Sequence, residues 1–289
     1  MNLLVNQLNL NKKDVDFFQE NGFITLRGLL TIKAINGLRE ITRTSQLQKP
    51  LKNFYGDFAK MGYNLENSTL AEIYHSQELR AIFNQLTQKK LKFTQAMGFE
   101  LEPQKTGFNW HVGIQAFHYI MPKDFACSLW IPLDPINTNE QHGGMAYVSR
   151  NIYSAYEYFS LMHQLVQSSN LSELLTAQDF HDSQYASKIE SLILEKNKVE
   201  DNFEVGDALL FDKFVWHRSC ILKEGKLTSR MAYVMRLIDG EARYSKTFLE
   251  GLDRSRATFG NPLQTMFGYK FSHLQDGEPI SKSRSDDGE

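Results

Sequence analysis

The chain predicts a mainly β fold, a sandwich or barrel with flanking helices, from three observations. Short apolar runs separated by turns begin near Phe99 and resume at Val205, which is the spacing of an all-β domain. Helical patterns are confined to the residues before Phe99 and to an insertion at about 151–200, whereas a parallel α/β sheet alternates strands with helices throughout. No Pro- or Gly-rich linker divides the 289 residues, so we expect a single domain, 1–289.

Caps and periodicity define the expected elements before Phe99. They are a helix over 14–22, a strand over 23–26, a helix over 31–42 and a mostly helical region over 71–95. Gly22 stands where a left-handed helix cap is expected, and Thr31 can cap the second helix. Apolar residues from Leu79 to Leu86 recur at three- and four-residue spacing, which is typical of a helix face. The mixed residues of 45–70 predict no element.

The second part of the chain predicts strands. We expect them at 99–102, 108–113, 116–120, 126–133, 145–148, 205–211 and 229–238, with a glycine-rich turn at 140–144. The insertion at about 151–200 predicts helices over 155–166 and 185–195; it is either a lid, a helical cover over a sheet face or a docking surface for a carrier protein. The polar tail, about 274–289, is expected to be disordered.

Composition excludes several classes of protein. The net charge of −2 predicts no nucleic-acid binding. No run approaches 18 apolar residues, so no membrane span is expected, and the N-terminus does not resemble a signal peptide. Cys127 and Cys220 are the only cysteines and are expected to be buried free thiols, which fits a reducing compartment and a cytoplasmic protein.

Two histidine motifs indicate the chemistry. The first is Asn109-Trp110-His111-Val112-Gly113, and the second is Val215-Trp216-His217-Arg218-Ser219. The second motif follows the apolar run 206–211, and Arg230 lies 13 positions after His217. Histidines on two distant strands and an arginine at this offset predict a non-haem iron site of the facial type, in which two imidazoles and one carboxylate occupy one face of the metal. The carboxylate is expected two residues after His111, where this chain has Gly113. The other six histidines lack this spacing.

The chain resembles the phytanoyl-CoA dioxygenase-type family of iron(II)- and 2-oxoglutarate-dependent oxygenases. The resemblance covers about 14–238 and rests on the opening 17–24, Trp110-His111, the segment 129–134, the turn Gly143-Gly144, and 206–217. It implies a double-stranded β-helix, a jelly roll related to the cupins. The chain departs from the family after Gly144, where Tyr147-Val148-Ser149-Arg150 replaces the usual Pro-Gly-Ser-His turn.

The resemblance also implies roles for single residues. His111 and His217 would bind iron(II) through one ring nitrogen each. Arg230 would pair with the distal carboxylate of 2-oxoglutarate, because a planar guanidinium donates two parallel hydrogen bonds. Ser219 resembles its hydroxyl partner, and Trp130 stands where the family has an aromatic residue against the cosubstrate. The structural alternatives are two packing histidines, a strand-end ion pair and a core tryptophan.

Three accounts of Gly113 are open. In the first, the open coordination position accepts chloride, as in the related non-haem iron halogenases that have glycine or alanine there, and the enzyme uses dioxygen to halogenate an unactivated carbon. In the second, water or a carboxylate from elsewhere, such as Asp124 or Glu102, fills the position and the product is hydroxylated or desaturated. This second account also covers the case in which Gly113 is a laboratory substitution of an original aspartate. In the third, iron is lost and a binding protein remains. Arg236 could lend positive charge near the anion, although an ordinary strand-end arginine is favoured. The substrate is expected to be a small molecule, free or tethered to a carrier protein.

Overall fold

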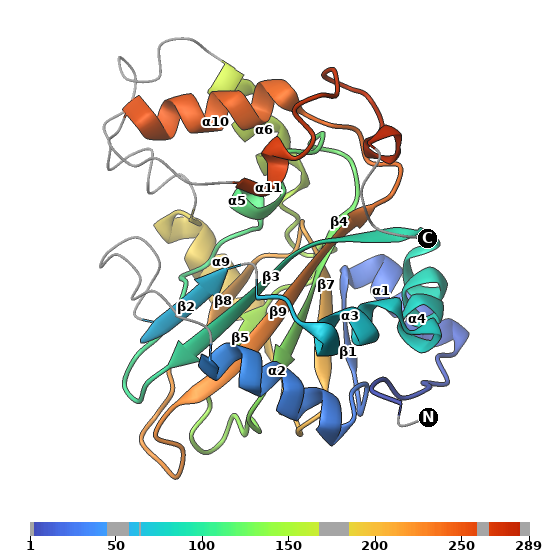
Figure 1. Cartoon of the computed structure of the whole chain (residues 1–289). Helices are drawn as coiled ribbons and strands as arrows, with labels where there is room; N and C mark the ends of the chain where they lie inside the picture. The colour runs from blue at the N-terminus through green and yellow to red at the C-terminus, as the bar shows by residue number, and fades with distance from the viewer. Residues whose placement is uncertain (1–2, 45–57, 64, 168–184, 259–265, 284–289) are drawn as a thin grey trace.

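The computed structural model describes residues 3–44, 58–63, 65–167, 185–258 and 266–283, and two antiparallel sheets form its centre (Figure 1). The major sheet has the order β1 (Phe23–Leu26), β7 (Ala208–Asp212), β4 (Ala126–Pro132), β9 (Arg230–Asp239), β3 (Leu91–Leu101) and β2 (Lys60–Tyr63). The minor sheet has the order β6 (Val199–Glu200), β5 (Met145–Tyr147) and β8 (His217–Ser219). Strands far apart in sequence are therefore neighbours, as a jelly roll requires.

Four helices cover the outer face of the major sheet. They are α1 (Lys12–Asn21), α2 (Ile32–Thr44), α3 (Ser68–His75) and α4 (Gln77–Thr87). Side chains alternate along a strand, and the odd-numbered residues of β4 and β9 pack in one core cluster with these helices. Gly22 ends α1 with φ 78°, in the left-handed region, as the sequence predicts.

A second helical layer covers the minor sheet. It consists of α6 (Tyr156–Gln167), α9 (Lys188–Asn197) and α10 (Lys246–Thr258), and α6 lies beside α10 (Figure 1). Phe159 and Met162 of α6, Leu194 of α9 and Phe248 of α10 pack in one core cluster with Ala146 of the minor sheet. The helices expected over 155–166 and 185–195 therefore form, and 168–184 of the insertion lies outside the described residues.

The inner faces of the two sheets meet in a third core cluster. It includes Trp130 of β4, Val234 of β9 and Phe211 of β7 from the major sheet, and Met145 and Tyr147 of β5 from the minor one. The even-numbered residues of β4 and β9 point to this side, so the pattern of one strand predicts which of its side chains enter the space between the sheets. That space contains the main pocket.

The helix expected over 71–95 is wrong in its second half. Gln88 takes a left-handed conformation with φ 56°, and its backbone N–H donates to Asn84 O at 2.8 Å, which ends α4. The chain then enters β3, where Leu91 to Leu101 pair with β9. The strand predicted over 99–102 is the end of this longer strand, because pairing with β9 outweighs the helical pattern of 91–95.

The strands expected over 108–113 and 116–120 are also wrong. In the first, only His111 forms β-bridges, to Tyr185 and His217. In the second, the short helix α5 (Ile114–Phe117) forms, because Gly113 O accepts the backbone N–H groups of Ala116 and Phe117 at 3.0 and 3.1 Å.

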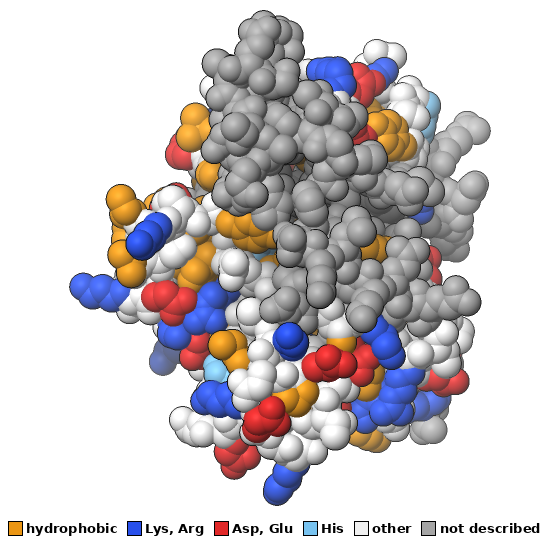
Figure 2. Space-filling model, turned by 90° about the vertical axis from the view of Figure 1, so that its left-hand side faces the viewer, with side chains coloured by type: hydrophobic (Ala, Val, Ile, Leu, Met, Phe, Trp, Pro, Cys, Tyr) orange, Lys and Arg blue, Asp and Glu red, His pale blue; other side chains and the backbone are white. Residues whose placement is uncertain are grey.

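The start of the expected disordered tail is packed. Leu274 and Ile280 are buried, and Tyr244 N donates to Glu278 O at 2.7 Å; α11 (Met266–Tyr269) and a 3-10 turn (Ile280–Lys282) are also present. Residues 284–289 lie outside the described part. No described helix is both long and apolar enough to cross a membrane. On the face in Figure 2, the described Lys, Arg, Asp and Glu side chains are interspersed.

Candidate metal and cosubstrate site

The two predicted histidines lie side by side. His111 N donates to His217 O at 2.9 Å and His217 N donates to His111 O at 3.1 Å, so the two residues form one antiparallel bridge. Their ring centroids are 4.2 Å apart. Both line the main pocket, which lies between the sheets. The structure therefore brings together two side chains that are 106 positions apart in the sequence, His111 and His217.

Each imidazole has one nitrogen available for a ligand. The Nδ1 of His111 is 2.7 Å from Asn109 O, and the Nδ1 of His217 is 2.9 Å from Val215 O. A carbonyl oxygen only accepts, so Nδ1 carries the hydrogen and the Nε2 lone pair is available in both rings. Burial lowers the pKa of His111 to about 4, and burial followed by the neighbouring His111 holds the pKa of His217 well below its ordinary value. Both rings are thus neutral near pH 7, the form that binds a metal.

Arg230 lines the same pocket as a buried cation. Its side chain is 2% exposed, and its Nε has no hydrogen-bond partner among the described residues. Burial lowers its pKa to about 10, so the guanidinium remains charged near neutrality. A buried N–H group without an acceptor is costly, and more so on a charged group. The position is therefore suited to an anionic ligand rather than to the strand-end ion pair considered as the alternative.

Trp130 lies near Arg230, and Ser219 lines the same pocket. The Cζ of Arg230 is 5.8 Å from the centroid of the Trp130 ring, within the range of a cation–π contact. Trp130 is 4% exposed and belongs to the inner core cluster, so it is a core residue that also faces the pocket. Ser219 lines the pocket from β8, and Ser128 of β4, which the sequence did not single out, adds a second serine to the wall.

Gly113 lines the pocket, and its backbone does not require glycine. Its φ of −74° is open to any residue. A Cβ built there would lie 3.0 and 3.1 Å from two ring carbons of Phe117, and 3.9 Å from the Cβ of Ala116. The Phe117 ring, which is buried, therefore lies against the position where a carboxylate side chain would begin. Phe117 was missed in the sequence because it follows Gly113 by one turn of a helix that was expected to be a strand.

The described wall of the pocket contains no aspartate or glutamate. Four cationic residues line it, Lys213, Arg218, Arg230 and Arg236, and the guanidinium of Arg218 pairs with Glu195. Asp124 does not line the pocket and pairs with Arg243 at 2.8 Å, and Glu102 is exposed outside it. Neither residue is therefore placed to fill the third ligand position, which corrects that expectation.

Arg236 lies inside β9 rather than at a strand end, so the favoured interpretation of it is wrong. It lines the pocket, and its NH1 donates to the neutral Gln95 Oε1 at 2.8 Å. Its positive charge contributes to the low pKa values of His111 and His217. Lys213 is buried, and burial lowers its pKa to about 7; its Nζ donates to Met121 O at 3.2 Å.

Aromatic side chains form much of the remaining wall, along with Val112, Ala116, Met145 and Val234. Phe58, Phe99, Phe108, Tyr185 and Phe211 line it together with Phe117 and Trp130. The Phe108 ring is 4.9 Å from that of His111, and the Phe211 ring is 4.6 Å from that of His217. The two imidazoles are therefore surrounded by apolar rings, which accounts for the burial that keeps them neutral. Cys127 and Cys220 are buried and free, as expected.

Comparison with solved structures confirms the predicted jelly-roll fold with flanking helices. The non-heme alpha ketoglutarate dependent epimerase SnoN from nogalamycin biosynthesis is similar with a TM-score of 0.63 and 14% identity over 94% of this chain and 96% of that one. The carbocyclase SnoK of the same biosynthesis gives 0.60 and 15% over 94% and 93%. EctD from S. alaskensis gives 0.58 and 13% over 86% and 85%. No family model and no curated protein matches the chain.

Proposed function

We propose that this protein is an iron(II)- and 2-oxoglutarate-dependent oxidative enzyme. The observation that supports this most is the coexistence, in one pocket, of two available imidazole nitrogens and the buried guanidinium of Arg230 without a partner at Nε. The neutral imidazoles of His111 and His217 would hold the metal. Arg230 would hold the distal carboxylate of 2-oxoglutarate, with Ser219 and Trp130 beside it.

The residues of the chain have defined tasks in this proposal. Bound iron and cosubstrate, with dioxygen, supply an oxidant that can remove a hydrogen atom from an unactivated carbon. The backbone carbonyls of Asn109 and Val215 fix the imidazole tautomers through Nδ1. The aromatic wall excludes water and positions a small-molecule substrate. SnoK and SnoN are a carbocyclase and an epimerase that depend on alpha ketoglutarate, which supports an oxidative reaction on this fold.

We further propose that the reaction is halogenation, with chloride beside Gly113. The support is local: no carboxylate stands in the described pocket wall, and Arg236 adds positive charge near both imidazoles. An anion from solution would then complete the coordination of the metal. Hydroxylation or desaturation, with water at this position, is the second candidate. It is retained because the structurally similar SnoK and SnoN, a carbocyclase and an epimerase, show that this fold supports several oxidative reactions. The proposal includes a substrate tethered to a carrier protein as well as a free one, for either reaction.

Anaerobic titration tests the first part of the proposal. Iron(II) and 2-oxoglutarate should give the visible charge-transfer absorption of their chelate on the native protein, and His217→Ala should abolish it because one of two protein ligands is lost. His75→Ala is the matched control, since His75 lies on α3 next to Arg80 and outside the pocket. Absence of the band from the native protein, or an undiminished band in His217→Ala, would refute the metal assignment.

Chloride tests the second part. Adding chloride or bromide to the loaded anaerobic protein should shift the absorption band, because a halide enters the coordination of the metal. The halide concentration should reach about a hundredfold above a typical dissociation constant for an anion site. A band that is still identical with and without halide would favour the hydroxylase candidate.

A further inference from the structure

A polar network connects the insertion to the two strands that bear the histidines. Its centre is Glu195 on α9, whose Oε1 accepts the indole N–H of Trp110 at 2.8 Å and the Nε–H of Arg218 at 2.6 Å. Its Oε2 accepts from NH2 of Arg218 at 3.1 Å and lies 3.2 Å from Lys198 Nζ. The guanidinium of Arg218 also lies 5.3 Å from the centroid of the Trp110 ring. One carboxylate thus joins Trp110 and Arg218.

The positions of these two residues give the network its importance. Trp110 immediately precedes His111, and Arg218 immediately follows His217. Neighbouring side chains of extended chains point to opposite sides. The imidazoles therefore meet on one side of the His111–His217 bridge, while Trp110 and Arg218 meet over Glu195. A second tie is the backbone, because Ala186 N, just before α9, donates to Trp110 O at 2.9 Å.

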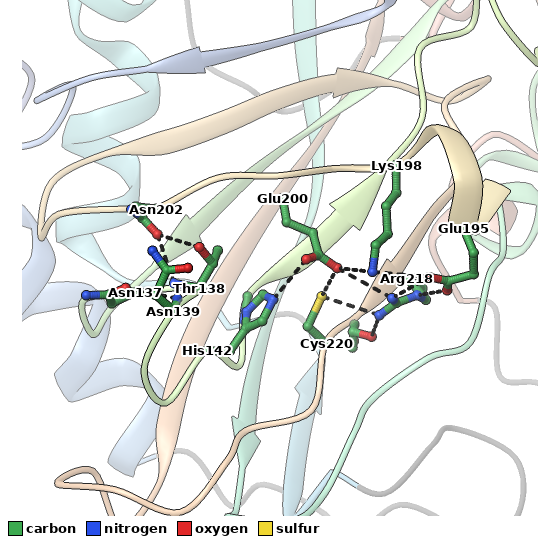
Figure 3. Close-up of polar contacts among 12 residues, drawn as sticks. Asn137, Thr138, Asn139, His142, Glu195, Lys198, Glu200, Asn202, Arg218 and Cys220 are labelled. Atoms are coloured by element: carbon green, nitrogen blue, oxygen red, sulfur yellow. Dashed lines mark hydrogen bonds and ion pairs between the residues drawn. The ribbon is translucent and has the colours of Figure 1, made fainter.

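A neighbouring cluster extends the network rather than forming a metal site. His142, Glu200 and Cys220 have ligand atoms within 4.8 Å of one another (Figure 3). Two cations already lie against this cluster: Lys198 Nζ is 2.8 Å from Glu200 Oε1, and Arg218 NH1 is 3.3 Å from Cys220 Sγ. A dication placed there would be repelled by both. The cluster instead fixes the far edge of the Arg218 guanidinium.

We propose that Glu195 is a positioning residue through which the insertion sets the separation and orientation of His111 and His217. The proposal rests on the proposed iron site. It has a physical motive, because a metal held by two side chains instead of three depends more strongly on how rigidly those two are held. Hydrogen-bonded partners of the ligand-bearing segments provide that rigidity, and Glu195 contacts both segments with one side chain.

The experiment measures Co(II) binding in the presence of 2-oxoglutarate, with the visible spectrum of Co(II) as a second readout. Glu195→Gln should raise the dissociation constant of Co(II) about tenfold and alter the spectrum. Trp110→Phe keeps an aromatic ring but removes the indole N–H together with the five-membered part of the indole, while Arg218 still donates to Glu195, so a smaller change in the same direction is expected. Glu195→Asp shortens the side chain and should behave like Glu195→Gln if reach to both partners is what matters.

Glu190→Gln is the matched control. Glu190 lies on the same helix and is partly buried, whereas Glu195 is exposed. Glu190 caps α9 through Ser187 and accepts from Tyr153 OH, and its hydrogen bonds with described residues do not include Trp110 or Arg218. Its variant should leave the dissociation constant and the spectrum unchanged even where the protein loses stability. Suppose that the native protein binds Co(II). Equal effects of Glu195→Gln and Glu190→Gln on the dissociation constant, or no effect of Glu195→Gln, would then overturn this inference alone. A native protein that binds neither Co(II) nor iron(II) would overturn the proposed function as well.

Discussion

Two parts of the pocket lining are built differently, and we call them the strand wall and the loop wall. One wall consists of regular strands: β4 contributes Trp130, and β9 contributes Arg230, Val234 and Arg236 at even positions. The other wall consists of a loop and a four-residue helix, from Phe108 to Phe117. The strand wall contains a buried cation that lacks a partner at Nε, whereas the loop wall contains a glycine whose side-chain space borders a phenylalanine ring.

The difference separates two parts of the function. Strands paired on both sides, such as β4 between β7 and β9, hold a side chain in a fixed place, which suits recognition of a cosubstrate that every turnover consumes. Loops tolerate substitution, and this suits the wall that determines the type of reaction on the substrate. In our proposal the strand wall binds 2-oxoglutarate and the loop wall determines which atom is transferred.

Arg230→Met is expected to give the largest effect and to test the strand wall. The affinity for 2-oxoglutarate should fall about 10- to 100-fold, because a charged bidentate partner is lost. The free energy of unfolding of the ligand-free protein should rise by about 1 kcal/mol, because a buried charge without a partner at Nε is replaced by an apolar side chain of similar length. Isothermal titration and urea unfolding measure the two quantities.

Opposite signs of these two changes are the distinctive result. Loss of stability together with loss of affinity would mean that Arg230 already has a structural partner in the free protein. Unchanged affinity would mean that 2-oxoglutarate binds elsewhere. Arg243→Met is the matched control, because Arg243 is an exposed arginine paired with Asp124 outside the pocket and should leave the affinity unchanged.

Substitutions at Gly113 test the loop wall, and a smaller effect is expected. Gly113→Asp alone should weaken the chloride-induced shift of the absorption band by roughly tenfold without placing a carboxylate on the metal, because its Cβ would lie 3.0 Å from the Phe117 ring. Gly113→Asp combined with Phe117→Ala provides the space and should abolish the shift. If the single variant already behaves like the double one, Phe117 does not restrict this position.

The strand wall was predictable from the sequence, and the loop wall was not. Arg230 and Trp130 lie in apolar runs that the sequence assigns to strands, which is where the structure has them. The role of the arginine, inferred from its offset from His217, stays a prediction. Residues 116–120 form a short apolar run, and periodicity alone cannot distinguish helix from strand in such a run. The contact of Phe117 with Gly113 depends on the helical turn, so it was missed.

The network of Glu195 was unpredictable for a different reason. Its three partners, Trp110, Arg218 and Lys198, are separated from one another by up to 108 residues, from Trp110 to Arg218. Only Lys198 is close enough in sequence to be inferred from helical spacing. A charged residue on a predicted helix is most often solvated, and only the closure of the minor sheet brings α9 over the histidine-bearing segments.

Acidification tests the loop wall through the stability of the protein without ligands, and its readout is His111. The folded pKa of about 4 lies below the ordinary value of 6.5, so between these values the unfolded chain binds a proton that the folded protein does not. The ligand-free protein should therefore lose stability as the pH falls from about 6.5 towards 4, by on the order of 2 kcal/mol from this group. Asp212 of β7, which does not line the pocket, acts in the opposite direction, because burial raises its pKa to about 6. Urea unfolding of the native protein and of His111→Ala separates the two, since the difference between their pH profiles isolates the imidazole. Parallel profiles from about pH 7 to about pH 4.5 would show that His111 is not held neutral by burial.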